Sequence, residues 1–389
     1  MKFLRKFLDK LEPQFKKGGK FPYLESTFDA FSSFLFVPNH TTQKGSHIRD
    51  AIDLKRTMSM VILALMPALI FGIWNVGHQH YLSQGQVFHS ITDMLFDKLI
   101  FGIIKVLPLL IVSYVVGLSI EFAFAQIRGH KVNEGFLVTG MLIPLIVPPD
   151  IPLWMLALAT AFAVIIGKEV FGGTGMNIFN PALLARAFLF FSYPAYMSGD
   201  MVWIAEKADA YSGATPLAMV ASGETTHLPS FWDMFVGIIP GSVGETSTIA
   251  ILIGAVFLIF TGIGSVRIMI SVFAGGYLTG LLFNLWGANS YMMLPAHYHL
   301  VIGGFAFGAV FMATDPVTAA QTNTGKVIYG LLIGAFAVLI RVLNPAYPEG
   351  MMLSILLLNT FAPLIDHYVI EAHIKRRLKR SNLVKTTNH

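Results

Sequence analysis

Long apolar stretches separated by short polar connections run through most of the chain. They predict ten hydrophobic helices, at 57–75, 97–123, 134–147, 151–167, 178–197, 246–263, 266–286, 299–313, 327–342 and 350–369. Several of these stretches have only about 15 residues, whereas a helix needs roughly 20 to cross the hydrocarbon core of a bilayer. We therefore expect some helices to be broken or extended by polar turns, which are common positions for binding sites in membrane transporters.

Lysine and arginine collect at alternate connections between the predicted helices, and this pattern sets their orientation. Because basic residues are retained on the cytoplasmic side, both termini are predicted to be cytoplasmic and the connection 198–245 to lie outside. Arg341, close to an outer end, does not fit the pattern. The basic ends are the N-terminal arm, Arg128, Lys131, Lys168, Arg267, Lys326 and the tail 375–380; the opposite connections are 76–96, 148–150 and 287–298, which have no lysine or arginine, and 198–245, which has only Lys207.

The composition agrees with a chain that is dissolved in lipid. Hydrophobic residues make up 54% of the 389 residues and charged residues 13%, whereas about 25% of an average soluble domain is charged. We predict an all-α polytopic membrane protein. The chain has no cysteine, which excludes disulfides, thiolate metal sites and iron–sulfur ligands of its own. Any redox cofactor is therefore organic or ligated by other groups.

Two stretches in opposite halves of the chain are similar to each other. When 139–148 is aligned with 307–316, Gly140 matches Gly308 and Pro148 matches Pro316. These stretches end the third and eighth predicted helices, so they run through the membrane in opposite directions. The match favours two inverted five-helix repeats, although chance similarity between glycine-rich apolar segments is the competing explanation. The predicted division is a basic arm at 1–56, a first repeat at 57–197, an outer connection at 198–245, a second repeat at 246–369 and a basic tail at 370–389.

The outer connection contains a turn of small residues, Asp209-Ala210-Tyr211-Ser212-Gly213-Ala214-Thr215-Pro216. Small side chains just before Thr215 allow a bulky group to approach its hydroxyl, and Pro216 favours an extended backbone that presents it. Thr215 is thus a candidate acceptor for a modifying group. From the residues alone, an ordinary turn rich in serine, glycine and proline is the more common interpretation.

The pattern Asp209-x-x-Ser212-Gly213-Ala214-Thr215 resembles the acceptor motif at which a flavin transferase attaches FMN to threonine through a phosphoester bond. The chain resembles the B subunits of Na⁺-translocating NADH:quinone oxidoreductases nearly end to end. The D subunits of Rnf ferredoxin:NAD complexes share this motif and Asp315-Pro316-Val317-Thr318, but they are similar only over the membrane part, so the arm at 1–56 favours the B-type family. The other matching stretches are 53–56, 167–182, 241–248 and 347–350.

The resemblance implies an electron-carrying subunit of a Na⁺ pump in the bacterial inner membrane, with a fold similar to that of urea and ammonium channels. It implies covalent FMN on Thr215 at the outer face and non-covalent riboflavin near Asn177 and Asn180, from which electrons reach quinone. Taken alone, 172–180 is a glycine-rich loop followed by a helix cap, so capping competes with a binding role for both asparagines. The implied partners are an FMN-bearing subunit of the C type, iron–sulfur membrane subunits, an FAD- and NADH-binding subunit, quinone, Na⁺, the flavin transferase and membrane lipids.

The turn 241–247 lies where the sixth predicted helix enters from the outer side. Free N–H groups and the positive end of the helix dipole suit a phosphate. We therefore expect Ser242 and Thr246 to contact the FMN phosphate. The competing interpretation is that Ser247 or Thr248 caps the helix, and the two roles can coexist.

Ionisable residues at membrane depth are candidates for function because burying an unpaired charge is costly. Glu121, Asp315 and Asp366 are therefore candidates for cation passage or quinone-linked proton uptake. Gly117 and Glu121 are the expected quinone site, since they place a small and an ionisable residue near the cytoplasmic end of one helix. Helix packing competes for Gly117, an N-cap role for Asp315, and pairing with the basic tail for Asp366.

Other functions are weaker interpretations. A non-redox channel or transporter of the same architecture has no use for a flavin acceptor loop, so flavin on Thr215 distinguishes the two. Nucleic-acid binding is rejected because basic residues that flank membrane helices face anionic lipid headgroups. The chain has no nucleotide-binding glycine fingerprint after a strand, so NADH must bind another subunit. The histidines are scattered without the spacing of paired haem ligands.

Overall fold

The computed structural model describes residues 54–387 apart from 89, 91, 130–134, 210, 224–227, 345, 346 and 348. It also describes 2–15 and scattered positions up to 48, so about half of the predicted arm at 1–56 lies outside the described residues. The regular elements in this part of the chain are all helices, as the hydrophobic pattern predicts. The first, α1 (Lys2–Phe15), mixes lysine and arginine with apolar residues.

Within the described residues, five helices are long and apolar enough to cross a membrane. Each of them contains one of the predicted hydrophobic stretches, and together they make the chain a polytopic membrane protein. They are α3 (Leu54–Ser83), α4 (Leu95–Arg128), α11 (Val266–Trp286), α14 (Asn323–Leu343) and α15 (Met351–Thr387).

The other predicted stretches form shorter or interrupted helices. Three of them have 10, 12 and 13 residues, fewer than the roughly 20 that a straight crossing needs. The stretch 151–167 ends in a π-helical turn, and 299–313 is divided into three short pieces. The interruptions expected from the stretch lengths are thus present. These elements are α5 (Phe136–Leu145), α6 (Leu153–Val164) with η2 (Ile165–Glu169), α7 (Pro181–Ser192), α10 (Thr248–Phe260), and α12 (Tyr298–Val301), α13 (Phe305–Phe307) and η4 (Gly308–Met312).

Side-chain oxygens cap the backbone amides at the start of two of the short helices, α7 and α10. Asn180 Oδ1 accepts hydrogen bonds from Ala182 N at 3.0 Å and from Leu183 N at 3.3 Å, ahead of α7. Ser247 Oγ accepts a hydrogen bond from Ala250 N at 3.3 Å, ahead of α10. These bonds satisfy amides that a helix leaves without partners in its first turn. The capping interpretation is therefore correct for Asn180 and Ser247, whatever else each side chain does.

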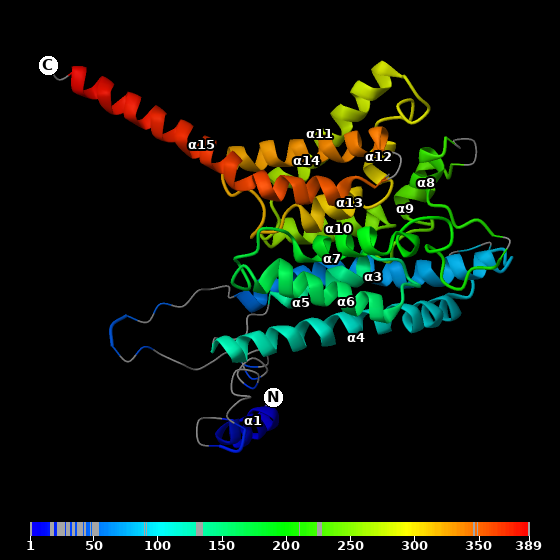
Figure 1. Ribbon diagram of the computed structural model, residues 1–389, viewed down its shortest axis with the longest axis horizontal. Coiled ribbons are helices and arrows are strands. Elements are labelled where there is room, and N and C mark those ends of the chain that lie inside the picture. Colours follow the sequence, from blue (N-terminus) through cyan, green and yellow to red (C-terminus); the bar gives the residue numbers. More distant parts are fainter. Residues whose placement is uncertain are drawn as a thin grey trace.

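The two ends of the helical bundle carry different parts of the chain (Figure 1). α15 leaves the bundle on the left, the side on which α3 begins, whereas α8 (Pro216–Ala221) and α9 (Phe231–Val236) lie on the right. We call these the tail end and the loop end. The arrangement agrees with the expectation that the basic tail and the connection 198–245 lie on opposite sides.

Glycine permits the close contact between two of the long helices. Gly275 of α11 faces the carbonyl oxygen of Leu331, and Gly334 of α14 faces that of Val272. A Cβ atom at either glycine would collide with the facing carbonyl. Small residues at such crossings allow helices to approach closely where the surrounding lipid provides no hydrophobic driving force.

Arg341 completes a broken helix at the loop end, which explains why it does not follow the charge pattern. Its guanidinium is fully buried and donates to the backbone oxygens of Glu349 at 2.8 Å, His299 at 2.7 Å and Ile302 at 2.9 Å. His299 and Ile302 belong to the end of α12, where carbonyls lack helical partners. Arg341 therefore has a structural role and is not a topology signal.

Candidate functional site

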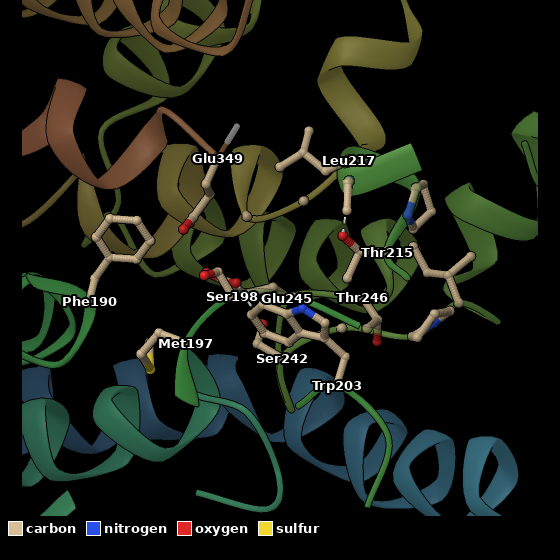
Figure 2. Close-up of a pocket in the computed structure, with 18 of the residues that line it drawn as sticks. Phe190, Met197, Ser198, Trp203, Thr215, Leu217, Ser242, Glu245, Thr246 and Glu349 are labelled. Atoms are coloured by element: carbon tan, nitrogen blue, oxygen red, sulfur yellow. Dashed lines mark hydrogen bonds between the residues drawn. The ribbon is translucent and has the colours of Figure 1, made fainter. Parts of the chain in front are cut away.

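A pocket opens at the loop end beside α8 (Figure 2). It has a volume of about 760 Å³ including its open mouth, within the range of about 300–1,000 Å³ that is usual for ligand sites. Thr215, Ser242 and Thr246 all line it. The structure therefore brings the candidate acceptor and both expected phosphate contacts into one cavity, which we call the Thr215 pocket. Arg186, Trp203, Tyr347 and Glu349 are also in its wall.

Thr215 stands immediately before α8 and is half-buried. Its backbone is extended, with φ −72° and ψ 154°, as the following proline predicts. Thr215 Oγ1 accepts a hydrogen bond from Ala218 N at 3.2 Å, drawn as a dashed line in Figure 2. In that bond the hydroxyl oxygen is only an acceptor, so the oxygen is fixed at the wall of the pocket with its own proton uncommitted.

The loop before Thr215 is held by a side chain that the sequence pattern does not predict. Asp200 Oδ2 lies 3.0 Å from Lys207 Nζ, and Asp200 Oδ1 accepts a hydrogen bond from Ser212 Oγ at 3.0 Å. Although burial acts in the opposite direction, the bonds from Lys207 and Ser212 lower the pKa of Asp200. Gly213 is buried against the same segment, where a Cβ atom would lie 2.5 Å from Asp200 O. In the sequence, the only indication of this contact was that Lys207 is the single lysine or arginine of the connection 198–245.

The remaining residues of the acceptor motif differ in exposure. Asp209 and Ser212 are exposed, and Ala214 is half-buried. Ala214 N donates a hydrogen bond to Ser212 Oγ at 3.5 Å. The acidic residue of the motif is therefore at the surface, where a second protein can contact it.

The turn ahead of α10 uses a backbone amide inside the protein. Gly244 N donates to Leu145 O at 2.7 Å and so satisfies a carbonyl at the end of α5. Ser242 Oγ donates to Glu245 Oε2 at 2.6 Å. The amide of Gly244 is therefore not available to a phosphate. The expected contact with a phosphate depends on the other backbone amides of the turn and on the hydroxyl of Thr246, which lines the pocket.

Three charged side chains form a buried ion cluster in the wall of the Thr215 pocket. Arg186 Nη1 lies 2.6 Å from Glu245 Oε1, and Arg186 Nη2 lies 2.7 Å from Glu349 Oε2. Tyr347 OH donates to Glu349 Oε2 at 3.3 Å. Burial raises the pKa of Glu349 to about 7, although Arg186 acts in the opposite direction. This cluster was not predicted from the sequence, where its signal was a lone arginine within the apolar stretch 178–197.

A second pocket, with a volume of about 830 Å³, lies at the tail end. Asn177, Asn180 and Asp315 all line it, although Asp315 is distant from the asparagines in the sequence. We call it the Asn177 pocket. Thr57 of α3 is in its wall, whereas Asn75 of α3 donates to Thr246 Oγ1, in the wall of the Thr215 pocket, at 3.4 Å. The separation of these positions along α3 is about 27 Å at 1.5 Å per residue, so the pockets lie near opposite ends of the bundle.

The two asparagines present different groups to the Asn177 pocket. Asn177 Nδ2 donates to Phe179 O at 3.0 Å, so its side-chain oxygen is left as an acceptor. Asn180 uses its Oδ1 to cap α7, so its Nδ2 is left as a donor. An acceptor and a donor side by side match the alternating polar edge of a flavin ring.

Asp315 closes a tight turn at the edge of the same pocket. Its Oδ1 accepts a hydrogen bond from Val317 N at 3.1 Å, and its Oδ2 accepts one from Thr318 Oγ1 at 3.0 Å. The capping role that competed for Asp315 is therefore present, together with a position in the pocket wall.

Glu121 is connected to the Asn177 pocket through a lysine. Glu121 is buried in α4 and forms an ion pair with Lys168 of η2, and Lys168 lines the pocket. Next to this pair, Arg128 Nη2 donates to Glu169 O at 2.8 Å, and Arg128 Nη1 lies 3.4 Å from Glu169 Oε2. Two adjacent ion pairs thus join the end of α4 to the π-helical turn.

Gly117 packs against an aromatic ring, which favours the packing interpretation. A Cβ atom there would collide with the ring of Phe136, a fully buried residue of α5. Gly117→Ala is therefore expected to destabilise the protein by about 1–3 kcal/mol, as overpacking usually does. A lower apparent melting temperature of the purified protein measures this effect.

Ser119→Ala is the matched control for Gly117→Ala, because Ser119 is exposed on the same helix. It is expected to leave stability within about 0.5 kcal/mol of the unmodified protein. A Gly117→Ala protein that melts normally but reduces quinone slowly would contradict the packing account and support a direct role at a quinone site.

Asp366 caps α14 and lies outside both pocket walls. Its carboxylate accepts hydrogen bonds from Gln321 N at 2.6 Å, Thr322 N at 2.9 Å and Thr322 Oγ1 at 2.5 Å. These partners account for its charge at the start of the helix, where the dipole favours an anion. The structure thus gives Asp366 a capping role in place of the expected pairing with the basic tail.

Comparison with known proteins gives close relatives. The model of the NQR2, RnfD, RnfE family matches residues 41–375. A protein from Ectopseudomonas mendocina, named as the B subunit of Na(+)-translocating NADH-quinone reductase, is 50% identical over 402 residues, covering 97% of this chain and 99% of that protein. Proteins of the same name are 49% identical in Chromohalobacter salexigens, covering 97% and 96%, and 48% identical in Azotobacter vinelandii, covering 97% and 99%.

Proposed function

The chain belongs to the NQR2, RnfD, RnfE family, and we propose that it is the B-type subunit of a Na⁺-translocating NADH:quinone oxidoreductase. The observation that carries this function is identity of 50% with a protein of that name over 97% of the chain. That coverage includes part of the N-terminal arm as well as the membrane part, which favours a B-type subunit over the D subunit of an Rnf complex. The chain acts as an enzyme only within its complex, because NADH binds elsewhere.

The Thr215 pocket fits covalent FMN. A threonine hydroxyl at the wall of a cavity of about 760 Å³ offers an oxygen for a phosphoester bond, and the exposed Asp209 is available to a flavin transferase. Trp203 lies across the pocket below Thr215 (Figure 2), where its ring can stack against an aromatic ligand. When bound, FMN would accept and donate electrons there. The protein's part is to hold the phosphate end on Thr215 and to set the charge around the ring through the Arg186 cluster.

The Asn177 pocket fits a second, non-covalent flavin, for which riboflavin is the proposal. It offers the Asn177 carbonyl as an acceptor and the Asn180 amide as a donor, and it has no hydroxyl in an acceptor motif like that of Thr215. Because the two pockets lie near opposite ends of α3, electrons that pass from the FMN to this flavin would cross the bundle.

Asn180→Asp and Asn180→Ala separate flavin binding from helix capping. Asp keeps the capping oxygen but removes the amide donor, whereas Ala removes both and costs about 1 kcal/mol of capping. If the amide holds riboflavin, both variants lose the flavin that is released on denaturation, and only Ala melts earlier. Retention of the released flavin by Asn180→Asp would remove Asn180 from the binding site.

Quinone is proposed to bind beside the Glu121–Lys168 pair. This pair adjoins the Asn177 pocket through Lys168, so electrons leaving a flavin there have a short path to quinone near Gly117. Glu121 is the group in this region that can supply a proton to reduced quinone. Asp315, in the same pocket wall, is the proposed cation contact, and Asp366 is a second candidate whose capping bonds make a direct role less favoured.

The proposed topology has ten membrane segments in two inverted repeats, in the inner membrane, with both termini cytoplasmic. Part of the packing recurs in the two halves and supports it: α4 contacts α6 as α11 contacts α14, and α6 contacts α7 as α14 contacts α15, whereas the contact of α3 with α4 is not repeated to the same extent between α10 and α11. Gly140 and Gly308, which match in sequence, both lie in the short interrupted helices. The FMN-bearing, iron–sulfur and FAD-containing subunits are the proposed partners, and they supply the electrons from NADH.

A further inference from the structure

Glu349 is placed differently from the other members of its ion cluster. Arg186 is buried and held by two carboxylates, and Glu245 is fixed by both Arg186 and Ser242. Glu349 lies in the connection between α14 and α15, outside both helices, and its carboxylate points into the Thr215 pocket (Figure 2). Glu245 also lines the pocket, but both of its carboxylate oxygens are bonded to Arg186 and Ser242, so Glu349 is the acid of the cluster that is better placed to change its protonation next to a ligand.

The charges of the cluster are balanced only when both acids are ionised. Glu349 is faced by Arg186 from α7, Glu245 from the turn before α10, Arg341 from α14 and Tyr347 from its own connection. Arg186 and Arg341 carry two positive charges, which Glu245 and Glu349 cancel. If Glu349 takes up a proton, the cluster gains one positive charge while Arg186 keeps Glu245 as a partner. Such a cluster can compensate one added negative charge in the pocket, where the low dielectric makes an uncompensated charge costly.

We propose that Glu349 takes up one proton when an electron resides on a flavin in the Thr215 pocket and releases it when the electron leaves. This inference rests on the proposed attachment of FMN to Thr215. The electron comes from NADH through the donor subunit, and the proton comes from water at the pocket mouth, beside the exposed Ser198 and Gly199. The only bond that forms or breaks is the O–H bond of Glu349. Since the proton enters and leaves by the same mouth, no proton crosses the membrane.

The pKa of the Glu349 carboxyl group agrees with this role. Because burial raises the pKa of Glu349 to about 7, the carboxyl group is close to half-protonated at neutral pH before any electron arrives. An added negative charge nearby raises that pKa further. Glu349 thus has one pKa when the flavin is oxidised and a higher pKa when the flavin is reduced. Proton uptake on reduction is largest between these two values, in the region just above neutral pH.

The test is a redox titration of the covalent flavin in the purified complex, from about pH 6 to about pH 9. In the unmodified complex, the reduction equilibrium constant is expected to fall up to tenfold per pH unit above neutral pH, which is about 59 mV for one electron. In Glu349→Gln the part of the slope that Glu349 contributes is expected to disappear, and the midpoint is expected to lie closer to the acid value of the unmodified complex. Any slope from protonation of the flavin ring itself is common to both proteins and cancels in the comparison.

Glu206→Gln is the matched control, because it makes the same change in charge at an exposed ion pair with Lys105, away from the pocket wall. Its midpoint is expected to follow the unmodified profile. If Glu349→Gln does not assemble, Glu349→Asp replaces it: a shorter carboxylate should keep the slope but move its pH range. A merely structural role would change assembly or flavin content without altering the pH profile.

Several outcomes overturn the inference. Glu349→Gln with the unmodified slope would do so, as would Glu349→Asp with an identical profile, or an unmodified complex whose midpoint does not change with pH. Fluorescence of the denatured chain separates this failure from a failure of the proposed function. A fluorescent chain with a flat profile removes only the role of Glu349, whereas a chain without covalent flavin removes both.

Discussion

Replacement of Thr215 by valine is expected to abolish quinone reduction by the complex. Valine has nearly the shape of threonine but lacks the oxygen that would carry the phosphoester bond, so the flavin of the Thr215 pocket is not attached. Oxidation of NADH by an artificial acceptor at the upstream subunits should continue, because that reaction does not pass through this chain. The two rates, measured on the same purified complex, give the result.

Two controls make the Thr215→Val result specific. Thr215→Asn keeps an oxygen that can cap α8 but has no hydroxyl, so it should fail in the same way as valine. Ser222→Ala removes a hydroxyl at the end of α8 that donates to Met219 O at 2.9 Å, and it should retain full activity. A Thr215→Val complex that reduces quinone at the unmodified rate would exclude a covalent flavin as an obligatory carrier.

Replacement of Arg186 by methionine is expected to have the largest effect on stability. It leaves the carboxylates of Glu245 and Glu349 buried without the cation that lies 2.6 Å and 2.7 Å from them. Removing one partner of a buried ion pair typically costs about 3–5 kcal/mol. The variant should accumulate poorly, and the part that can be purified should have a markedly lower apparent melting temperature.

The origin of that loss is tested by restoring charge balance. Arg186→Met combined with Glu245→Gln and Glu349→Gln removes the unpaired charges and should recover part of the lost stability. Arg267→Met is the surface control, because Arg267 only donates to Asn323 Oδ1 at an exposed position, and it should stay within about 0.5 kcal/mol. A triple variant as unstable as Arg186→Met alone would show that packing around the arginine, not its charge, is what matters.

Much of the fold follows from the hydrophobic pattern. The five longest helices contain five of the predicted stretches, and the lengths of the others already indicated interruptions. The extended backbone of Thr215 follows from Pro216, and the caps of α7 and α10 follow from Asn180 and Ser247. These features depend on residues close together in the chain, which is why local patterns predict them.

The features that could not be predicted from the sequence depend on contacts between distant segments. Arg186, Glu245 and Glu349 come from three separate connections and helices, and only the fold brings them to one pocket. Arg341 looked like a topology exception because the broken helix that it completes cannot be seen in the pattern. Asp200 gave no signal beyond the single lysine of its connection, because the loop must fold back before Lys207 and Ser212 reach its carboxylate.

The central claim is that Thr215 carries a flavin. Mass spectrometry of the peptide containing Thr215, from a complex made together with a flavin transferase, tests it most directly. The account predicts a peptide heavier by one FMN less one water, with the added mass on Thr215 and absent from Thr215→Val. A Thr215 peptide that is entirely unmodified in an active complex would contradict it.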